Sequence, residues 1–222
     1  MYKKLSVLIP VYNEKNTIES CLDAVLNAEI GDLELEVIIS DNNSFDGTKE
    51  ILSKIKNQKV KILYRKNNDG KGANIKNALK EATGDLILFQ DADLEYSPRD
   101  YLDLLEPFYR FNADVVFGSR LTRAKATSIV GFPNYMGNII LTFFANFLFN
   151  KIFTDIATGY KVFKKEIIKN LEISSNGFEI EPEITAKISK NMKIKIFEVP
   201  ITINSRGYSC LLYTSPSPRD GL

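Results

Sequence analysis

The chain has 222 residues, of which 44% are hydrophobic and 26% charged, as is typical of a soluble globular protein built around one large domain. Its formal net charge is +1 without a strongly basic stretch, so we do not expect nucleic acid as its main partner. The absence of histidine excludes histidine-ligated zinc and Ser-His-Asp chemistry. Cys21 and Cys210 lie far apart, which favours a reducing compartment over a structural disulfide.

The amino-terminal segment lacks the long apolar core and cleavage site of a secretory signal peptide. No stretch reaches the length of about 18 apolar residues that crosses a bilayer. The nearest is Ile139–Phe149, which is too short. We therefore expect a cytoplasmic protein without a spanning helix.

Short apolar runs alternate with segments of helical periodicity through the first 100 residues. Helices are predicted from about residue 16, from residue 48 and after the loop 66–74, and the four strands are predicted at 5–11, 35–40, 60–64 and 86–89. This β-α repetition predicts a parallel sheet with right-handed crossovers. Further on we expect a helix after Pro98, a strand at 115–120, a helix near residue 181 and a last strand at 194–201.

Polar residues follow the first, second and fourth predicted strands. A buried strand does not carry carboxylates into the core, so the acids are expected just past the strand ends, where open α/β sheets bind ligands. This edge collects Glu14, Asp41, Asp91 and Asp93. Asp91, Asp93 and Glu95 offer hard oxygen ligands that suit Mg²⁺ or Mn²⁺. The alternative is a solvated acidic turn before the helix that Pro98 starts.

Two nucleotide-binding motifs are missing from this edge. The first strand runs into PVYNEKN instead of G-x-G-x-x-G, which argues against a dinucleotide-binding dehydrogenase. Gly70–Gly72 lacks the spacing and the Ser/Thr of a P-loop, although its glycines could let backbone approach a ligand beside the charge of Lys71. The alternative is a flexible loop leading into a helix. Arg120 ends the fifth strand and suits phosphate, or else pairs with the acids at the surface.

The segment 129–153 is apolar and rich in aromatic residues. The composition favours a core helix packed on the sheet for most of these residues. The alternative is a surface that dips into a bilayer interface or contacts a lipid chain.

Taken together, VLIPVYNE, LEVIISDNNSFDGT, NNDGKGAN, FQDADLEYSP and VVFGSR resemble glycosyltransferase family 2, and within it the polyprenol-phosphate (dolichol-phosphate) mannose or glucose synthases. DIATGYKVFKKE, GFEIEPEITAKI and EVPITINSR are similar to the second half of their catalytic domain, so the resemblance covers roughly residues 4 to 208. It implies a GT-A fold, which is a Rossmann-like, mainly parallel α/β sheet flanked by helices with a C-terminal acceptor-side subregion. It also implies a nucleotide-sugar donor, a divalent cation and a polyprenyl phosphate acceptor.

On this resemblance we predict one GT-A domain over residues 1–209, with a nucleotide-sugar-binding half at 1–120 and an acceptor-side half at 121–209. The remaining residues, 210–222, read CLLYTSPSPRDGL and lack core periodicity. We interpret them as a non-native or disordered tail.

The resemblance also assigns the donor side of the site. The base and ribose would be held by Pro10, Tyr12, Glu14 and Asp41. Lys71 and Asp91 would complete the nucleotide-sugar site, and the metal on the diphosphate would be held by Asp91, Asp93 and Glu95, the last replacing a glutamine of some relatives.

The acceptor side is assigned in the same way. Arg120 and Arg206 would contact phosphate groups, and Asp155 matches a position near the acceptor. The catalytic set implied is Asp93, Arg120 and Asp155. A phosphate acceptor is already an anion, so it needs a general base less than an alcohol does, and a chain without histidine loses little.

The predicted reaction transfers a sugar from a donor of the GDP-mannose or UDP-glucose type to a polyprenyl phosphate, with inversion, at the cytoplasmic face of a membrane. Two alternatives stay open. The chain could be a family 2 transferase that acts on a glycan or other hydroxyl, for which Asp155 is the available base. It could also be a nucleotide-sugar-binding module that is inactive through loss of its C-terminal segment.

Overall fold

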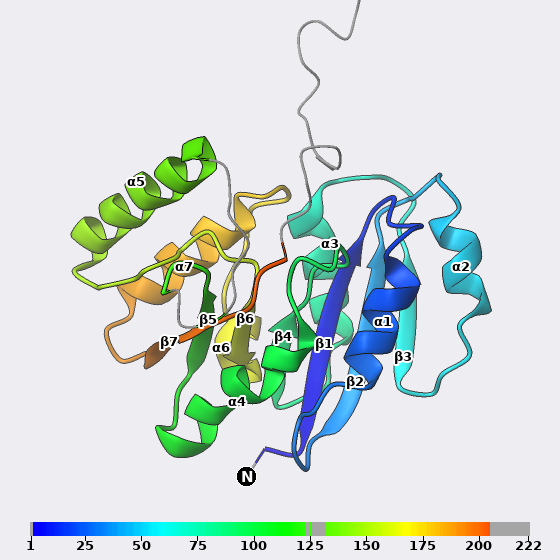
Figure 1. Cartoon of the computed structure of the whole chain (residues 1–222), viewed down its shortest axis with the longest axis horizontal. Coiled ribbons are helices and arrows are strands. Elements are labelled where there is room, and N and C mark those ends of the chain that lie inside the picture. Colours follow the sequence, from blue (N-terminus) through cyan, green and yellow to red (C-terminus); the bar gives the residue numbers. More distant parts are fainter. Residues whose placement is uncertain (1, 123–124, 126–131, 205–222) are drawn as a thin grey trace, which may run out of the picture.

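A computed structural model of the chain describes residues 2–122, 125 and 132–204. Its centre is a seven-stranded sheet with the order β3-β2-β1-β4-β6-β5-β7 (Figure 1). The strands are β1 Lys4–Val11, β2 Glu34–Asp41, β3 Val60–Tyr64, β4 Leu86–Phe89, β5 Val115–Ser119, β6 Lys161–Lys164 and β7 Ile196–Pro200. The helices are α1 Ile18–Leu26, α2 Thr48–Lys54, α3 Lys71–Glu81, the 3₁₀ turn Pro98–Asp100, α4 Tyr101–Arg110, α5 Phe132–Phe149, α6 Lys165–Lys169 and α7 Ile180–Lys190.

The sheet is mainly parallel, as predicted. β1 pairs in parallel with β2 and β4, β2 with β3, and β5 with β7. The exception is β6, which is antiparallel to both β4 and β5. Neither β6 nor the short α6 was predicted, because four strand residues between polar segments show no readable periodicity.

Helices cover both faces of the sheet, and alternate residues of each strand face opposite ways. From β1, Leu5, Val7 and Ile9 pack in one hydrophobic cluster with residues of α1 and α4, whereas Leu8 packs in the other with residues of α3 and α7. The strands β1, β2, β4 and β5 are therefore largely buried on both sides, which explains their continuous apolar runs, whereas the outer strands β3 and β7 are only partly buried.

The carboxyl ends of β1 and β2 lie side by side, since Val11 is in register with Asp41. α3 fixes this edge through Asn74, which is buried and whose Nδ2 donates to the carbonyl oxygens of Val11 (3.3 Å) and Ser40 (2.6 Å). β4 ends beside β1, so the loop that carries Asp91 begins at the same edge. The predicted collection of polar side chains is thereby formed.

α5 has its polar side chains turned inward. Asn138, Thr142 and Asn146, spaced four residues apart, bond to the segment 153–156: Asn138 to Asp155, Thr142 to the amide of residue 156, and Asn146 to both backbone groups of Phe153. Because these residues occupy the inner face, the apolar residues point outward. α5 lies at the outer side of the molecule, away from β3 (Figure 1).

The prediction that most aromatic residues of 129–153 lie in the core is therefore wrong. The side chains left more than half exposed are Phe132, Leu141, Phe143, Phe144, Phe147, Leu148 and Ile152. Only part of the segment, including Ala145 and Phe153, is buried. In the part of the chain that the structure describes, no helix combines the length and apolar character required to span a membrane.

Candidate active site

Lys71 and Asp91, both predicted for the donor site, form an ion pair. The Lys71 Nζ lies 2.8 Å from Asp91 Oδ1 and 3.0 Å from Oδ2, and it also lies 2.8 Å from Glu181 Oε1. Burial alone would lower the pKa of Lys71, but the charges and hydrogen bonds of Asp91 and Glu181 raise it well above its usual range. Lys71 thus joins the loop after β4 to α7 as a fixed cation. Glu181 was not predicted, although an acid in the first turn of a helix was the available signal.

Asp93 and Glu95 lie on the loop that follows Asp91. The Glu95 amide donates to Asp93 Oδ1 at 3.0 Å, and Leu94 between them has a φ of 63°, so the loop turns sharply. Among residues 2–122, 125 and 132–204, no three acidic or cysteine side chains gather closely enough to hold a metal. The assignment of Asp91, Asp93 and Glu95 to a metal therefore stays a prediction.

The four residues predicted for the base and ribose all lie at the ends of β1 and β2: Pro10, Tyr12, Glu14 and Asp41. Asp41 is fully buried and accepts from the Ser44 amide at 3.2 Å. Tyr12 meets the ring of Phe45 edge-on, with 6.1 Å between centroids.

Asn13 joins the loops that follow these two strands. Its φ is 54°, its amide donates to Ser44 Oγ at 2.9 Å, and its Oδ1 accepts from the Phe45 amide at 3.0 Å. The two loops therefore form one wall at the sheet edge.

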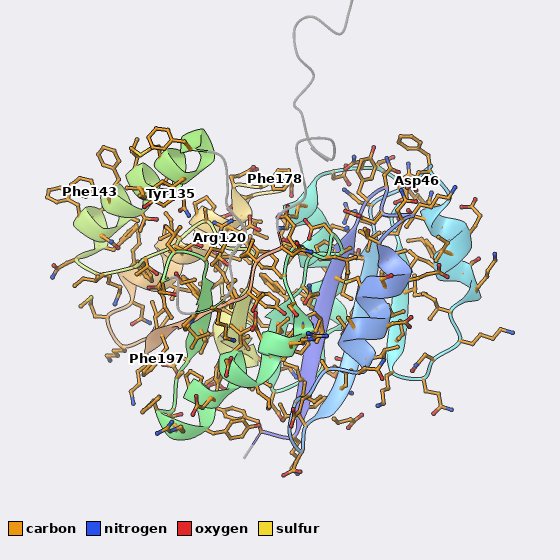
Figure 2. The ribbon with its side chains drawn as sticks, in the orientation of Figure 1. Asp46, Arg120, Tyr135, Phe143, Phe178 and Phe197 are labelled. Carbon is orange, nitrogen blue, oxygen red and sulfur yellow. The ribbon has the colours of Figure 1, made fainter. Side chains whose placement is uncertain are left out.

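Arg120 and Asp155, predicted for the acceptor side, form a bidentate ion pair. Nε lies 2.6 Å from Oδ2 and Nη2 lies 2.8 Å from Oδ1, while the Arg120 amide donates to Oδ2 at 3.1 Å (Arg120 is labelled in Figure 2). Asn138 of α5 adds a bond of 2.7 Å to Oδ1. Burial alone would raise the pKa of the fully buried Asp155, but its bonds to Arg120 hold the pKa below the ordinary value of 3.8. Arg206, their predicted companion, lies outside the described residues.

Glu198 of β7 binds the backbone that carries Asp155, and this residue was not predicted. Its carboxylate accepts from the Thr154 amide at 2.9 Å and from the Asp155 amide at 3.2 Å. Burial raises the pKa of Glu198. The signal in the sequence was an acid inside an otherwise apolar strand, IFEVP.

Tyr96 and Gly159 connect the two halves of the site. The Gly159 amide donates to the Tyr96 hydroxyl at 3.1 Å, and the Tyr96 ring stacks on Tyr160 with 4.9 Å between centroids. A Cβ at Gly159 would lie 2.7 Å from Asp91 Oδ2, so only glycine lets this segment approach the carboxylate without a shift.

Lys161 is fully buried at the start of β6. Its Nζ donates to the carbonyl oxygens of Ile156 (3.4 Å) and Thr158, and lies 4.9 Å from the Phe117 ring centroid. Burial lowers the pKa of Lys161 to about 8. By binding these two carbonyl groups, the ammonium stabilises the conformation of the segment between Asp155 and Gly159.

The glycine-rich loop was predicted either to let backbone approach a ligand or to be flexible. In the structure, the backbone that packs closely against this loop is that of residues 175–177: a Cβ at Gly72 would lie 2.7 Å from the Ser175 carbonyl oxygen. The first turn of α3 is capped by this neighbour, because the amides of Gly72 and Ala73 donate to the carbonyl oxygens of Gly177 (3.2 Å) and Asn176 (2.9 Å). The amides of Gly72 and Ala73 are thus bound within the chain, and the side chain of Lys71 reaches the site.

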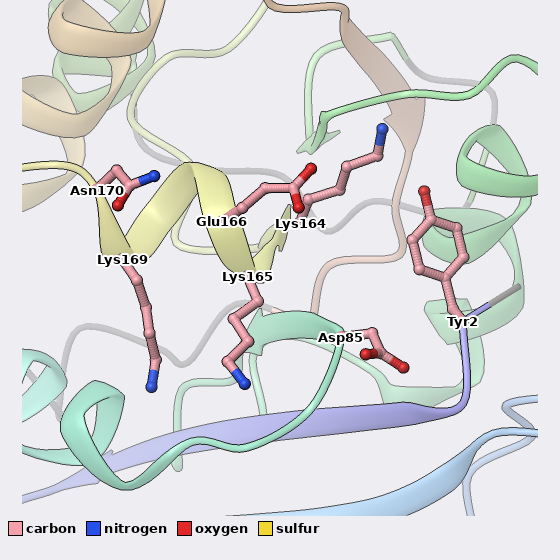
Figure 3. A pocket seen from close by; sticks show the side chains of 7 residues that line it. All are labelled: Tyr2, Asp85, Lys164, Lys165, Glu166, Lys169 and Asn170. Atoms are coloured by element: carbon pink, nitrogen blue, oxygen red, sulfur yellow. The ribbon is translucent and has the colours of Figure 1, made fainter.

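A lysine-rich cavity of about 520 Å³ lies at the opposite edge of the sheet, where β4 begins and the antiparallel β6 ends (Figure 3). Its ammonium groups already have partners. Lys165 donates to the Thr83 carbonyl oxygen (3.1 Å), Lys169 to that of Ala82 (2.7 Å), and Lys164 to Asp114 Oδ1 (2.7 Å). Lys165 and Lys169 thus join α6 to the segment between α3 and β4, and the cavity is remote from the acidic edge.

The known proteins similar in sequence to this chain include the following three. A dolichol-phosphate mannosyltransferase of Pyrococcus furiosus is 31% identical over 94% of this chain and 59% of its own length. The low-salt glycan biosynthesis hexosyltransferase Agl6 of Haloferax volcanii is 30% identical over 91% and 48%, respectively. A UDP-N-acetylglucosamine–dolichyl-phosphate N-acetylglucosaminyltransferase of Methanococcus voltae is 26% identical over 93% and 88%. The chain thus spans about half the length of the first two relatives.

Solved structures share the fold at lower identity. Glucosyl-3-phosphoglycerate synthase of Mycobacterium tuberculosis, in complex with Mn²⁺, UDP and phosphoglyceric acid, superposes with a TM-score of 0.70 at 20% identity over 92% of this chain and 72% of its own. TarS of S. aureus, in complex with UDP-GlcNAc, gives a TM-score of 0.64 at 22% identity over 96% and 62%. These likenesses confirm the predicted GT-A fold.

The sequence profile described as glycosyl transferase family 2 matches residues 6–172, which is most of the chain. The match begins in β1 and includes the acidic loop, Arg120 and Asp155. It confirms the resemblance on which the site residues were assigned. The chain belongs to glycosyl transferase family 2.

Proposed function

We propose that the protein transfers a sugar from a nucleotide-sugar donor to a polyprenyl phosphate. The observation that carries this proposal is the position of α5, which binds Asp155 through Asn138 and turns an uncharged, aromatic face outward. The cation of Arg120 is thus linked through Asp155 and Asn138 to the inner face of the helix whose opposite face is apolar. A phosphate at the end of an isoprenoid chain matches both features. Two of the similar relatives are named for dolichol phosphate.

The state of Asp155 favours a phosphate over a hydroxyl acceptor. A general base works best with a pKa near the operating pH, yet its bonds to Arg120 hold the pKa of Asp155 below 3.8. Asp155 is therefore a poor base for activating an alcohol. A lipid phosphate brings its own negative oxygen and needs only to be held, which is what Arg120 supplies electrostatically.

The donor would lie across the ends of β1, β2 and β4. Tyr12 and Asp41 would contact the base and ribose, with Pro10 and Glu14 beside them, and Lys71 would face the diphosphate. Lys71 suits this role because its pKa is raised and its charge is therefore permanent at neutral pH. Lys71 and Arg120 offset part of the charge of the nearby acids, and a bound divalent cation would supply further positive charge for an anion held at this edge.

The acids fit a divalent cation of the Mg²⁺ or Mn²⁺ type. Such ions are commonly held by one or two carboxylates together with substrate phosphates, and Asp91 and Asp93 provide two carboxylates on one loop, with Glu95 after them. A solved structure of the same fold contains Mn²⁺ together with UDP. When bound, the cation would neutralise charge on the departing nucleoside diphosphate.

The reaction that follows is an in-line displacement with inversion. An oxygen of the acceptor phosphate forms a bond to the anomeric carbon while the bond from that carbon to the diphosphate oxygen breaks, and the electron pair leaves with the nucleoside diphosphate. Arg120 would orient the acceptor phosphate, and Lys71 would stabilise the charge that develops on the leaving group.

We further propose that the outer face of α5 rests in the membrane interface. No charged residue occurs from Phe132 to Asn150, and Phe143 and Phe147, one turn apart, are 65% and 78% exposed. Replacing both with Asn should weaken binding to lipid vesicles about thirtyfold, since burying each ring in lipid contributes roughly 1 kcal/mol to the free energy of binding. Phe45→Asn, at an 80% exposed ring distant from α5, is the matched control. Equal vesicle binding by all three proteins would contradict this role of α5.

A transfer assay with purified protein tests the whole proposal. GDP- and UDP-sugars are each incubated with Mn²⁺ and either a short polyprenyl phosphate or the corresponding polyprenol. The expected result is transfer to the phosphate from one donor, and none to the alcohol. Asp93→Asn should abolish metal-dependent transfer without unfolding, whereas Asp32→Asn, an exposed acid at the opposite edge, should not. Transfer to the alcohol alone, or full activity of Asp93→Asn, would refute the acceptor or the metal assignment respectively.

A further inference from the structure

Gln90 is the residue that follows β4, and its side chain is fully buried. Its Nε2 donates to the carbonyl oxygens of Asp91 (2.9 Å) and Tyr96 (3.4 Å). Its Oε1 accepts from the hydroxyls of Tyr101 (3.0 Å) and Tyr160 (3.0 Å). Both polar atoms of the amide are therefore satisfied, as a buried amide requires.

The two carbonyl groups bound by Gln90 lie at opposite ends of the acidic loop. The backbone ladder stops here, because the Gln90 amide makes the last bond to β1, donating to the Leu8 carbonyl oxygen at 3.0 Å. Beyond it, the side-chain amide closes the loop by linking Asp91 to Tyr96. Fixing both ends restricts the residues between them, Asp93 among them, to fewer conformations.

Two tyrosines bind the oxygen of the amide. Tyr101 comes from α4, and Tyr160 comes from the segment that leads from Asp155 into β6. The Tyr160 hydroxyl shares its proton between Gln90 Oε1 and the Ser97 carbonyl oxygen at 2.9 Å. Since the carbonyl oxygens of Asp91 and Tyr96 can only accept, the NH₂ group must face the loop, and Oε1 then accepts from the two hydroxyls. Gln90 thereby ties the acidic loop to the acceptor-side half of the site.

We propose that Gln90 is a positioning residue that holds the acidic loop in the geometry that binds a divalent cation together with a nucleoside diphosphate. The inference rests on the proposed function for the identity of the ligand. Gln90 contacts neither ligand: it acts through the backbone on both sides of Asp93. Its loss should therefore weaken metal-dependent binding more than it weakens metal-free nucleotide binding.

The test compares Gln90→Met, which keeps the length of the side chain and removes both donors, with Tyr101→Phe, which removes one donor to Oε1 and leaves the loop bonds intact. Thermal shift is followed with UDP and with GDP over a Mn²⁺ titration. Gln90→Met should raise the half-saturating Mn²⁺ concentration about tenfold, as expected for two lost hydrogen bonds. Tyr101→Phe should change it less than twofold, and metal-free nucleotide binding should be equal in all three proteins.

Amide hydrogen exchange of the loop 91–96 gives a second readout that does not depend on the ligand. Exchange should speed up at least tenfold in Gln90→Met and stay near the wild-type rate in Tyr101→Phe. If Gln90→Met does not fold, Gln90→Glu replaces it, since a carboxylate still accepts from the tyrosines but cannot donate to the loop. A folded variant with wild-type loop exchange or wild-type Mn²⁺ dependence would overturn the inference. If the wild-type protein shows no metal dependence, the proposed metal fails, and loop exchange alone then decides the role of Gln90.

Discussion

Replacing Asp155 with Asn tests whether its ion pair with Arg120 is as strong as the geometry indicates. The carboxylate is fully buried and accepts three bonds from Arg120, at 2.6, 2.8 and 3.1 Å, and one from Asn138. Removing one partner of a buried pair leaves the other charge uncompensated and costs about 3–5 kcal/mol. Domains are stable by only about 5–15 kcal/mol, so this is a large fraction of the total.

Urea denaturation at pH 7 measures the effect on the free energy of unfolding, and a melting curve should show a fall of roughly 6–20 °C for a chain of this size. Glu106→Gln, which breaks the exposed pair with Arg110, is the matched control and should cost less than about 1 kcal/mol. Because the folded-state pKa of Asp155 is depressed, its contribution is present above its ordinary pKa of 3.8 and is lost as the pH falls through the folded-state value. The difference in the free energy of unfolding between wild type and Asp155→Asn should thus be constant from pH 8 to pH 5 and shrink below about pH 4.

A double-mutant cycle with Arg120→Met decides whether the loss of stability in Asp155→Asn comes from the broken ion pair itself. Arg120→Met removes the charge that Asp155→Asn leaves uncompensated, so the double variant should be more stable than the two single losses predict, by about 2 kcal/mol. Losses that add to within about 0.5 kcal/mol would refute the reasoning.

Two further substitutions test the packing and the buried charge. Gly72→Ala should lower the free energy of unfolding by about 1–3 kcal/mol in urea, because its Cβ meets the Ser175 carbonyl oxygen at 2.7 Å, whereas Gly137→Ala, with nothing within 4 Å, should not destabilise. The folded-state pKa of Lys161 is about 8 against an ordinary 10.5, so the unfolded chain binds more protons between these values and stability rises with pH. From pH 7.5 to pH 10.5 the free energy of unfolding should rise by about 3 kcal/mol more for wild type than for Lys161→Met. Parallel curves of unfolding free energy against pH for the two proteins would contradict the lowered pKa of Lys161.

Periodicity predicted most of the fold because its central strands are largely buried on both faces and most of its helices have one apolar face turned to the sheet. It failed where those conditions do not hold. β6 is four residues long and contains the buried Lys161, so it does not resemble a core strand. In α5 the hydrophobic pattern is inverted, and composition alone cannot show which face of a helix meets the protein. The spacing of Asn138, Thr142 and Asn146 was the available signal, since three polar residues on one face of an apolar helix mark a face with its own partners.

The site was predicted as a set of residues at one edge, and the structure brings Lys71 to Asp91 and Arg120 to Asp155. The sequence did not reveal these partners because spacing along a chain does not specify contacts between distant elements. For the same reason Glu181 and Glu198 were missed. The metal assignment of Asp91, Asp93 and Glu95 remains a prediction.

The contact between the start of α3 and residues 175–177 also bears on how the chain folds. The family profile ends at residue 172, yet the amides of Gly72 and Ala73 are capped by carbonyl groups beyond that point. Lys71 likewise depends on Glu181, and β5 gains its outer neighbour only from β7. A fragment that stops where the recognised family sequence stops would bury a lysine with one counterion fewer and expose the edge of β5. The packed unit of this fold is therefore longer than the stretch by which the family is recognised, and it includes α7 and β7.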